Sequence, residues 1–217
     1  MSLPRNIGAG VWLLLFVGYL AFFSWYTSFG GPLTSEEIAH YSGVVEEISD
    51  GDPQRIAAWQ HFVQTDTGDD WGMISVVDLN ETPRPIEGVE PGESSEEVLA
   101  KYTDPFFGRA VPSAGHPVLV GRAAAPAIDI WGVEGATDWS QGVVVRWRSR
   151  RDFLKVVEAI RDDADDSGIH AFKIAAIEKT IAYPLDPWFH LGDPRIVLSL
   201  LFAVIGLSVQ ASSPRDG

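Results

Sequence analysis

The sequence contains no cysteine among its 217 residues, and few residues of positive charge. The missing cysteine excludes disulfide bonds, a thiolate nucleophile, cysteine-ligated zinc and iron–sulfur clusters, although it does not assign a compartment. Lysine and arginine number 16 against 30 aspartate and glutamate residues, so the formal net charge is −14. Binding to nucleic acid, or peripherally to anionic lipid, depends on clustered basic side chains, and neither is expected. The acidic residues instead predict a well-solvated surface.

The sequence also lacks the short motifs of common enzymes and metal sites. No GxSxG nucleophile elbow, P-loop, HExxH motif or recognisable Ser/His/Asp order occurs. His40 and His61 lack the H-x-x-x-H spacing of a zinc pair, which predicts ordinary helix residues. The acidic run 162–166 lacks the glycine and the distal glutamate of an EF-hand, so it predicts a solvated turn rather than a cation site. No metal and no cofactor are therefore expected.

Charged residues are absent from residues 7–29, a run long enough to cross a hydrocarbon core of about 30 Å as a helix. Trp25 and Tyr26 suit the interface at the end of such a span. A cleavable signal peptide is the main alternative. The apolar run is longer than the usual ~7–15 residues of a signal peptide, and no clear small-x-small site precedes Gly30. We therefore expect an uncleaved transmembrane helix over residues 7–29.

The distribution of charge around this run predicts its orientation. Arg5 and the amino terminus precede it, whereas Glu36 and Glu37 follow it and no further lysine or arginine occurs before Arg55. The positive-inside rule then places residues 1–6 in the cytoplasm and the main domain on the extracytoplasmic, periplasmic side of a membrane.

A second apolar run near the carboxyl end is shorter. Ile196–Ala211 is apolar apart from two serines and one glutamine, and as a helix it rises about 24 Å. We expect residues 195–211 to form a second transmembrane helix, followed by a tail over residues 212–217. The alternative is an interfacial or a core helix.

Between these runs the sequence predicts a helical lead-in over residues 30–70 and then an α+β domain over residues 71–186. Thr34 with Glu37 forms a capping box, and Asp52 precedes a proline that suits the first helical position. The domain is expected to run strand, helix, long bent strand, strand, helix, strand. The expected segments are Gly72–Asn80, a helix after Ser94, His116–Val120 with Ala127–Val133, Trp139–Arg148, Arg150–Ile160 and Phe172–Tyr183. This order predicts a ferredoxin-like, split βαβ antiparallel sheet with helices on one face.

The stretch from His116 to Pro184 carries a resemblance. Its pattern is HPVLVGRA…DIWGV…WSQGVVVRWRSRRDFLKVV…HAFKIAAIEKTIAYP. This pattern resembles the DUF1330-like branch of the dimeric α/β-barrel superfamily over Val118–Tyr183, with Met73–Asn80 as the first strand. The superfamily includes small monooxygenases, haem-degrading enzymes and many members without known activity. The resemblance implies homodimers that pair sheet to sheet, and a ligand held between the sheet and the helices.

Two functional hypotheses follow. The first is a membrane-anchored, dimerising module with an accessory or scaffold role, whose partners are the lipid bilayer, a second copy and a candidate membrane protein. The second is a small-molecule-binding protein or cofactor-independent monooxygenase, in which Trp131 stacks on an aromatic substrate and Arg146 positions it. The alternatives are that Trp131 belongs to the core and that Arg146 pairs with Glu178 or a neighbouring acid, because an arginine on a strand face requires an anion. The candidate ligand-binding residues are Asn80, His116, Arg122, Trp131, Arg146 and His170.

Overall fold

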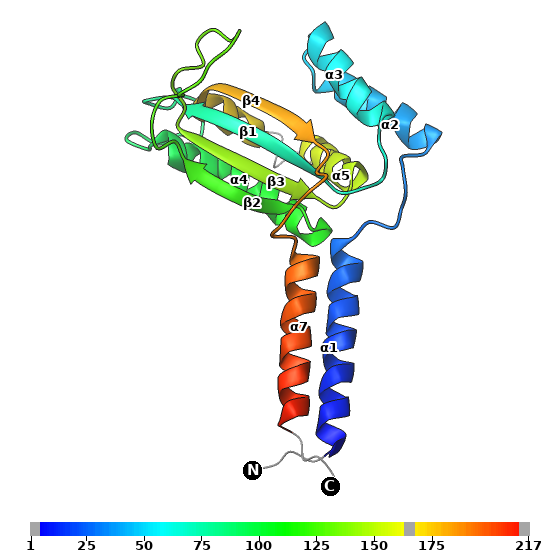
Figure 1. Ribbon diagram of the computed structural model, residues 1–217. Coiled ribbons are helices and arrows are strands. Elements are labelled where there is room, and N and C mark those ends of the chain that lie inside the picture. Colours follow the sequence, from blue (N-terminus) through cyan, green and yellow to red (C-terminus); the bar gives the residue numbers. More distant parts are fainter. Residues whose placement is uncertain (1–4, 163–167, 213–217) are drawn as a thin grey trace. The chain divides into compact units, whose positions relative to one another are not determined.

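A computed structural model describes residues 5–162 and 168–212 of the chain. The chain divides into two compact units. Unit 1 combines its two ends, Met1–Thr27 and Trp188–Gly217, and unit 2 is the continuous segment Ser28–Pro187. Figure 1 shows the helices and strands of both units.

Unit 1 is a pair of apolar helices, α1 (Arg5–Tyr26) and α7 (Pro194–Ala211). Gly206 of α7 lies directly against the ring of Trp12 on α1, where no larger residue fits without a shift of the ring. The hydroxyl of Tyr19 donates a hydrogen bond of 3.1 Å to the carbonyl oxygen of Arg195. A small residue on one helix therefore accommodates a large aromatic residue on the other, which is a common way for apolar helices to approach closely.

Unit 2 begins with the helices α2 (Ser35–Glu47) and α3 (Pro53–Gln64). Both start at the caps that the sequence predicts. Thr34 and Glu37 form a reciprocal capping box, with bonds of 3.2 and 2.8 Å between each backbone N–H and the other's side chain. Asp52 accepts the backbone N–H groups of Gln54 and Arg55. These bonds satisfy N–H groups that have no partner within the helix.

Four strands in the described part of the chain form one antiparallel sheet in the order β2-β3-β1-β4. Helices lie between them in the sequence, so that the order is β1, α4, β2, β3, α5, α6, β4. The fold is therefore α+β and has the split βαβ topology that the sequence predicts. The bounds are β1 (Trp71–Leu79), α4 (Ser95–Ala110), β2 (His116–Arg122), β3 (Gln141–Trp147), α5 (Arg150–Asp162), α6 (Ile169–Ala176) and β4 (Ile177–Leu185), with a short 3₁₀ turn at Val111–Ser113.

Two predicted strands differ from the structure. The strand expected over Phe172–Tyr183 is wrong in its first part, because α6 continues to Ala176 and β4 begins only at Ile177. Alanine is the best helix former, and the segment holds Ala171, Ala175 and Ala176. The strand expected over Ala127–Val133 is also wrong. Among the described residues no strand pairs with this segment, and Gly132 in it has a positive φ that suits a turn.

An aromatic core fills the space between one side of the sheet and the helices. The ring of Phe153 on α5 lies 4.9 Å from that of Trp147 and 5.2 Å from that of Trp71. Phe62 of α3 also contacts Trp71, at 4.8 Å between ring centroids. A second buried cluster joins β1, α4, α6 and β4 through Val77, Val98, Leu99, Ala175, Ala176 and Ile177. All these helices therefore cover the same side of the sheet, and within the described part of unit 2 no helix of these clusters packs against its other side.

Candidate functional site: the open face of the sheet

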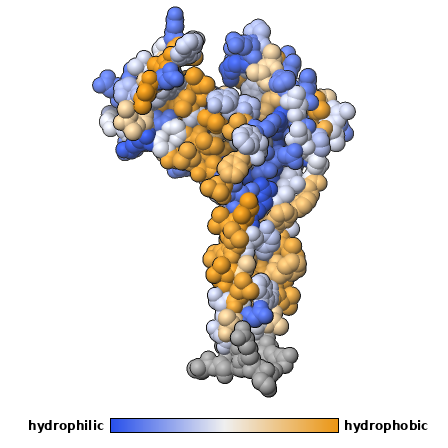
Figure 2. All heavy atoms as spheres, in the orientation of Figure 1, coloured by the Kyte–Doolittle hydropathy of each residue, from blue (hydrophilic) through white to orange (hydrophobic). Residues whose placement is uncertain are grey.

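The uncovered side of the sheet, called here the open face, is predominantly apolar. Successive residues of a strand point to opposite sides, so Ile74 and Val76 lie opposite to the buried Trp71 and Val77. The strand register places the neighbours of these residues on the same side. The open face consists of Ile74, Val76, Leu119, Val144, Ile181, Tyr183 and Leu185, together with the charged residues discussed next. Figure 2 shows apolar residues gathered over the sheet on the side that faces the viewer.

Each charged residue on the open face that the register identifies has an oppositely charged partner. Lys179 lies opposite Asp78 in the sheet, with 3.4 Å between Nζ and Oδ2. The carboxylate of Asp78 also accepts the hydroxyl of Ser140 at 2.8 Å. Arg146 pairs with Asp70, which directly precedes β1, at 3.1 Å. The open face thus combines exposed apolar side chains with balanced charge.

Arg146 is fully engaged within the fold. It is 4% exposed, and its guanidinium donates to Asp70 Oδ2 and to the carbonyl oxygen of Ala114, the latter at 3.4 Å. Ala114 has a positive φ of 54°. Of the two predicted roles for Arg146, the structure shows pairing with a neighbouring acid, and that acid is Asp70 rather than Glu178. His116 is its cross-strand neighbour, and the Nδ1 atom of His116 lies 3.1 Å from the carbonyl oxygen of Pro117.

Asn80 and Arg122 lie at the other end of the sheet. The side-chain amide of Asn80 donates to the carbonyl oxygen of Ala175 at 2.8 Å, and its backbone carbonyl accepts the hydroxyl of Ser95 at 2.7 Å. Asn80 therefore joins β1 to α6 and α4. Arg122 forms an exposed ion pair of 2.9 Å with Glu96 on the helix side.

Trp131 and His170 are separate from both ends of the sheet. Trp131 is 90% exposed in the connection between β2 and β3, so its alternative assignment to the core is wrong. His170 lies on α6 with its ring against that of Tyr102, at 6.2 Å. Of the predicted ligand-binding residues, the register makes neighbours only of His116 and Arg146. A ligand-binding role for the set stays a prediction.

Tyr102 on α4 forms a cluster of titratable side chains with His170 and Lys173 on α6, and the sequence alone did not predict this cluster. Lys173 lies over the ring of Tyr102, with 5.4 Å from Nζ to the centroid. Burial lowers the pKa of Lys173, and the charge of Arg55 lowers it further. Burial also raises the pKa of Tyr102 to about 12. Partial burial, followed by the charges of Lys173 and Arg55, lowers the pKa of His170. The spacing of His170 and Lys173 on one helix face would have indicated the cluster if this segment had been predicted as a helix.

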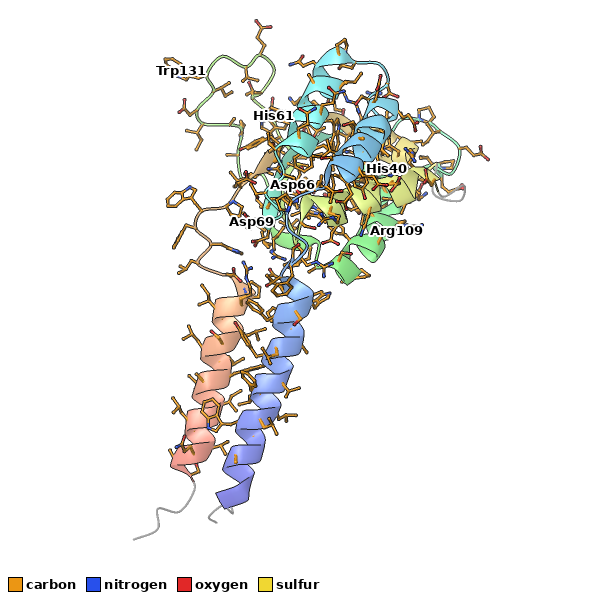
Figure 3. The ribbon with its side chains drawn as sticks, turned by 90° about the vertical axis from the view of Figure 1, so that its right-hand side faces the viewer. His40, His61, Asp66, Asp69, Arg109 and Trp131 are labelled. Carbon is orange, nitrogen blue, oxygen red and sulfur yellow. The ribbon has the colours of Figure 1, made fainter. Side chains whose placement is uncertain are left out.

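Two further histidines lie on the helices α2 and α3. His40 on α2 pairs with Glu158 at 2.6 Å, and His61 lies on α3 (Figure 3). Within residues 5–162 and 168–212, no group of three or more His, Asp or Glu side chains is arranged to hold a metal ion. The predicted solvated turn at 162–166 lies outside the described residues except for Asp162, which pairs with Arg161 at 2.7 Å.

Two helices in the described part of the chain are long and apolar enough to cross a membrane. They cover Gly8–Tyr26 and Pro194–Ala211. A signal sequence near the amino terminus has the same length and composition as such a span.

Comparison with known proteins leaves the function open. No family model matches the chain, and no curated protein matches it. A protein of unknown function from Rhodopseudomonas palustris is similar in structure at 17% identity, covering 64% of this chain and 95% of that one, with a TM-score of 0.47. A methylated form gives 18% identity, 65% and 95% coverage and a TM-score of 0.49. A dimeric protein of unknown function and ferredoxin-like fold from Bacteroides fragilis gives 13% identity, 54% and 96% coverage and a TM-score of 0.31. The topology of this chain follows from its own strand order.

Proposed function

We propose that this protein is a membrane-anchored module that pairs with a second copy through the open face of its sheet and has an accessory or scaffold role. The observation that carries the proposal is the open face itself, an apolar and charge-balanced surface on an otherwise acidic chain. Leu119 is 65% exposed there, and Ile181, Tyr183 and Leu185 are also exposed. Contiguous exposed apolar surface of this kind marks a site of association.

The charge of the chain favours this face for pairing. Two copies with a formal charge of −14 repel one another over most of their surfaces. On the open face, Asp78 is neutralised by Lys179 and Arg146 by Asp70. Contact there removes apolar side chains from water without bringing unmatched charges together.

The anchoring part of the proposal rests on α1 and α7 as membrane spans. Both helices expose large aliphatic side chains along their length, such as Leu14 and Leu200. The charged residues at the start of α7 neutralise one another, because Arg195 pairs with Asp193 at 2.6 Å and lies over the ring of Tyr26. The span therefore begins at Pro194 without an unpaired charge inside the bilayer. With the positive-inside orientation, unit 2 lies on the extracytoplasmic side.

The accessory role is supported by the hydrogen bonds that two of the polar candidate residues form within the fold. Arg146 and Asn80 have their hydrogen-bonding groups engaged by other parts of unit 2. Such residues stabilise the fold, and a module of this kind acts through its surfaces.

A matched pair of substitutions on β2 tests the pairing. Leu119 lies opposite Val144 on the open face, whereas Val120, which is 63% exposed, lies opposite Val143 on the helix side. We expect the full-length protein in detergent to be a dimer by analytical ultracentrifugation. Leu119→Glu should raise the dimer dissociation constant at least about tenfold, because it places a charge in an apolar contact. Val120→Glu should leave it unchanged. A monomeric wild type, or equal behaviour of both variants, would contradict the proposal.

A further inference from the structure

The connection between β2 and β3, residues 123–140 and called here the arm, has a defined conformation. At its base, the backbone N–H of Ala123 donates to the carbonyl oxygen of Ser140 at 2.9 Å. Further out, the N–H of Ala127 donates to the carbonyl oxygen of Thr137 at 2.7 Å. Gly132 and Gly135 both have a φ of 68°, which suits the turns at the end of the arm. The arm is therefore a hairpin-like extension of the sheet.

A lysine of the open face holds the arm. Lys179 Nζ donates to the carbonyl oxygen of Gly135 at 2.7 Å and lies 5.2 Å from the centroid of the Trp139 ring. The same ammonium pairs with Asp78 on the open face. One side chain of the open face is thus bonded both to the sheet and to the arm.

The outer part of the arm carries large apolar side chains in water. Ile128 is 98% exposed, Trp131 is 90% exposed, and Ile130 and Val133 are also exposed. Figure 3 shows Trp131 on the arm, pointing away from the helices of unit 2. Single exposed apolar residues are common, but a tryptophan with three aliphatic residues on a preformed hairpin has the composition of an interface anchor.

The charges of the arm favour a protein as its contact. The arm joins Arg122 at the end of β2 to Gln141 at the start of β3, and this is the end of the sheet away from Trp71 and Leu185. Asp129 and Glu134 beside the apolar tip disfavour anionic lipid.

The open face is too small to form a stable interface between two proteins by itself. A sheet of this width and strand length presents about 500 Å² on one side. A stable pair of proteins buries about 800 Å² on each partner, so the open face alone falls short. A buried tryptophan with its aliphatic neighbours adds roughly 200–300 Å², which closes the gap.

We infer that the arm is the second half of the dimer interface, and that each copy lays its apolar tip against the other copy when the open faces meet. This inference rests on the proposed function. A two-fold axis makes the contact reciprocal, so every copy both donates an arm and receives one.

Removal of the apolar tip tests the inference in the full-length protein in detergent. The double variant Ile128→Ser, Trp131→Ser should raise the dimer dissociation constant about 10- to 100-fold, because a central tryptophan carries much of the binding in many interfaces. Its thermal midpoint at a concentration where it is monomeric should equal that of the monomeric Leu119→Glu variant, since both side chains are exposed. Trp188→Ser, which removes another highly exposed tryptophan, should have no effect. An unchanged dissociation constant in the double variant would overturn the inference.

A spin label at the tip gives a second readout. The chain has no cysteine, so Ile128→Cys provides a unique attachment site. We expect the nitroxide to lose mobility in the dimer and to regain it on dilution. Equal mobility in both states would overturn the inference. A label in nanodiscs that is accessible to oxygen dissolved in the lipid would also overturn it, and would identify the bilayer as the contact.

The outcomes separate the inference from the proposed function. Loss of the dimer in Leu119→Glu but not in the arm variant would leave the proposed function standing and remove the arm from the interface. Loss in the arm variant but not in Leu119→Glu would overturn pairing through the open face. A wild type that is monomeric at all concentrations would overturn both.

Discussion

Arg151 on α5 is bonded at two points to Glu37 in the first turn of α2. The two bonds measure 2.6 Å from Nε to Oε1 and 3.0 Å from Nη2 to Oε2. Arg151 also donates to the carbonyl oxygens of Gly31 and Pro32, which directly precede α2. A bidentate arginine–carboxylate pair is among the stronger polar contacts in proteins. This arginine therefore fixes the start of unit 2 to a helix more than a hundred residues further along the chain.

This pair predicts a pH dependence of stability. The hydrogen bond from Arg151, followed by the backbone bond from Thr34, lowers the pKa of Glu37 from 4.5 to about 2. A carboxyl with a lowered folded-state pKa contributes stability above its unfolded value, and that contribution is lost as the pH falls from about 4.5 towards 2. Glu37→Gln should lower the free energy of unfolding at pH 7 by about 1–2 kcal/mol and flatten its decline in this window. Urea unfolding at several pH values measures both effects.

The neighbouring glutamate provides the control for this prediction. Glu36 is exposed in the same helical turn, so Glu36→Gln changes the net charge equally without removing the pair. It should alter stability by less than about 0.5 kcal/mol. If the two variants unfold alike at every pH, the pair with Arg151 does not stabilise the protein.

Gly115 precedes β2 at a point where the backbone lies against the Trp147 ring. A Cβ atom there would lie 2.6 Å from that ring. Trp147 is packed against Phe153 and cannot move without disturbing the core, so Gly115→Ala should cost about 1–3 kcal/mol in unfolding free energy. Gly121→Ala on β2 meets open space and is the matched control. Similar stability of the two variants would show that the ring adjusts freely.

The parts of the fold that the sequence predicts are those determined by near neighbours. Thr34 with Glu37 and Ser94 with Glu97 start helices because each pair bonds across three residues. The alternation in β1 is also local, since it follows from the two sides of a single strand. These signals are sufficient for the α+β class and for the order of the elements apart from α6.

The remaining features depend on contacts between distant residues. Arg146 requires an anion, but the choice of Asp70 over Glu178 follows from which end of the sheet the arginine occupies. Tryptophan is a residue type often found in protein cores. Trp131 is nevertheless exposed, because no strand among the described residues pairs with the arm. The boundary between α6 and β4 falls within an apolar run, where periodicity alone does not distinguish the two structures.

The contact between Gly206 and Trp12 predicts how unit 1 responds to substitution. Gly206→Leu should separate α1 from α7, because the added side chain occupies the space of the Trp12 ring. Gly18→Leu, at a position with open space, should not. Nitroxides at Phe16→Cys and Ile205→Cys report the distance between the helices in nanodiscs. An unchanged distance distribution in Gly206→Leu would show that this contact does not hold the helices together.

Removal of Arg146 should be costly to the fold. Arg146→Ala leaves the carboxylate of Asp70 and the carbonyl of Ala114 without this donor, so we expect a loss of about 2–4 kcal/mol in unfolding free energy. Arg122→Ala breaks an exposed pair and should cost less than about 1 kcal/mol. Equal effects of the two variants would contradict the structural role of Arg146.

The small-molecule hypothesis makes a different prediction about the same protein. If Arg146 serves the fold, native mass spectrometry of the full-length dimer should show the mass of two chains with no added ligand. A reproducible additional mass that disappears in Trp131→Ala, a variant that leaves the core intact, would instead support a ligand site and identify its content. Trp188→Ala is the control for loss of an exposed tryptophan.

The absence of cysteine makes the membrane topology directly measurable. Ile128→Cys lies on the exposed arm of unit 2, and Ser212→Cys follows α7. If α1 and α7 both span the bilayer with the amino terminus in the cytoplasm, a membrane-impermeant maleimide should label Ile128→Cys in intact cells. The same reagent should label Ser212→Cys only after permeabilisation, because two spans return the chain to the side from which it started. Labelling of both positions in intact cells would mean that α7 does not cross the membrane, and labelling of Ser212→Cys alone would contradict the orientation of unit 2. The unsubstituted chain gives no signal and is the internal control.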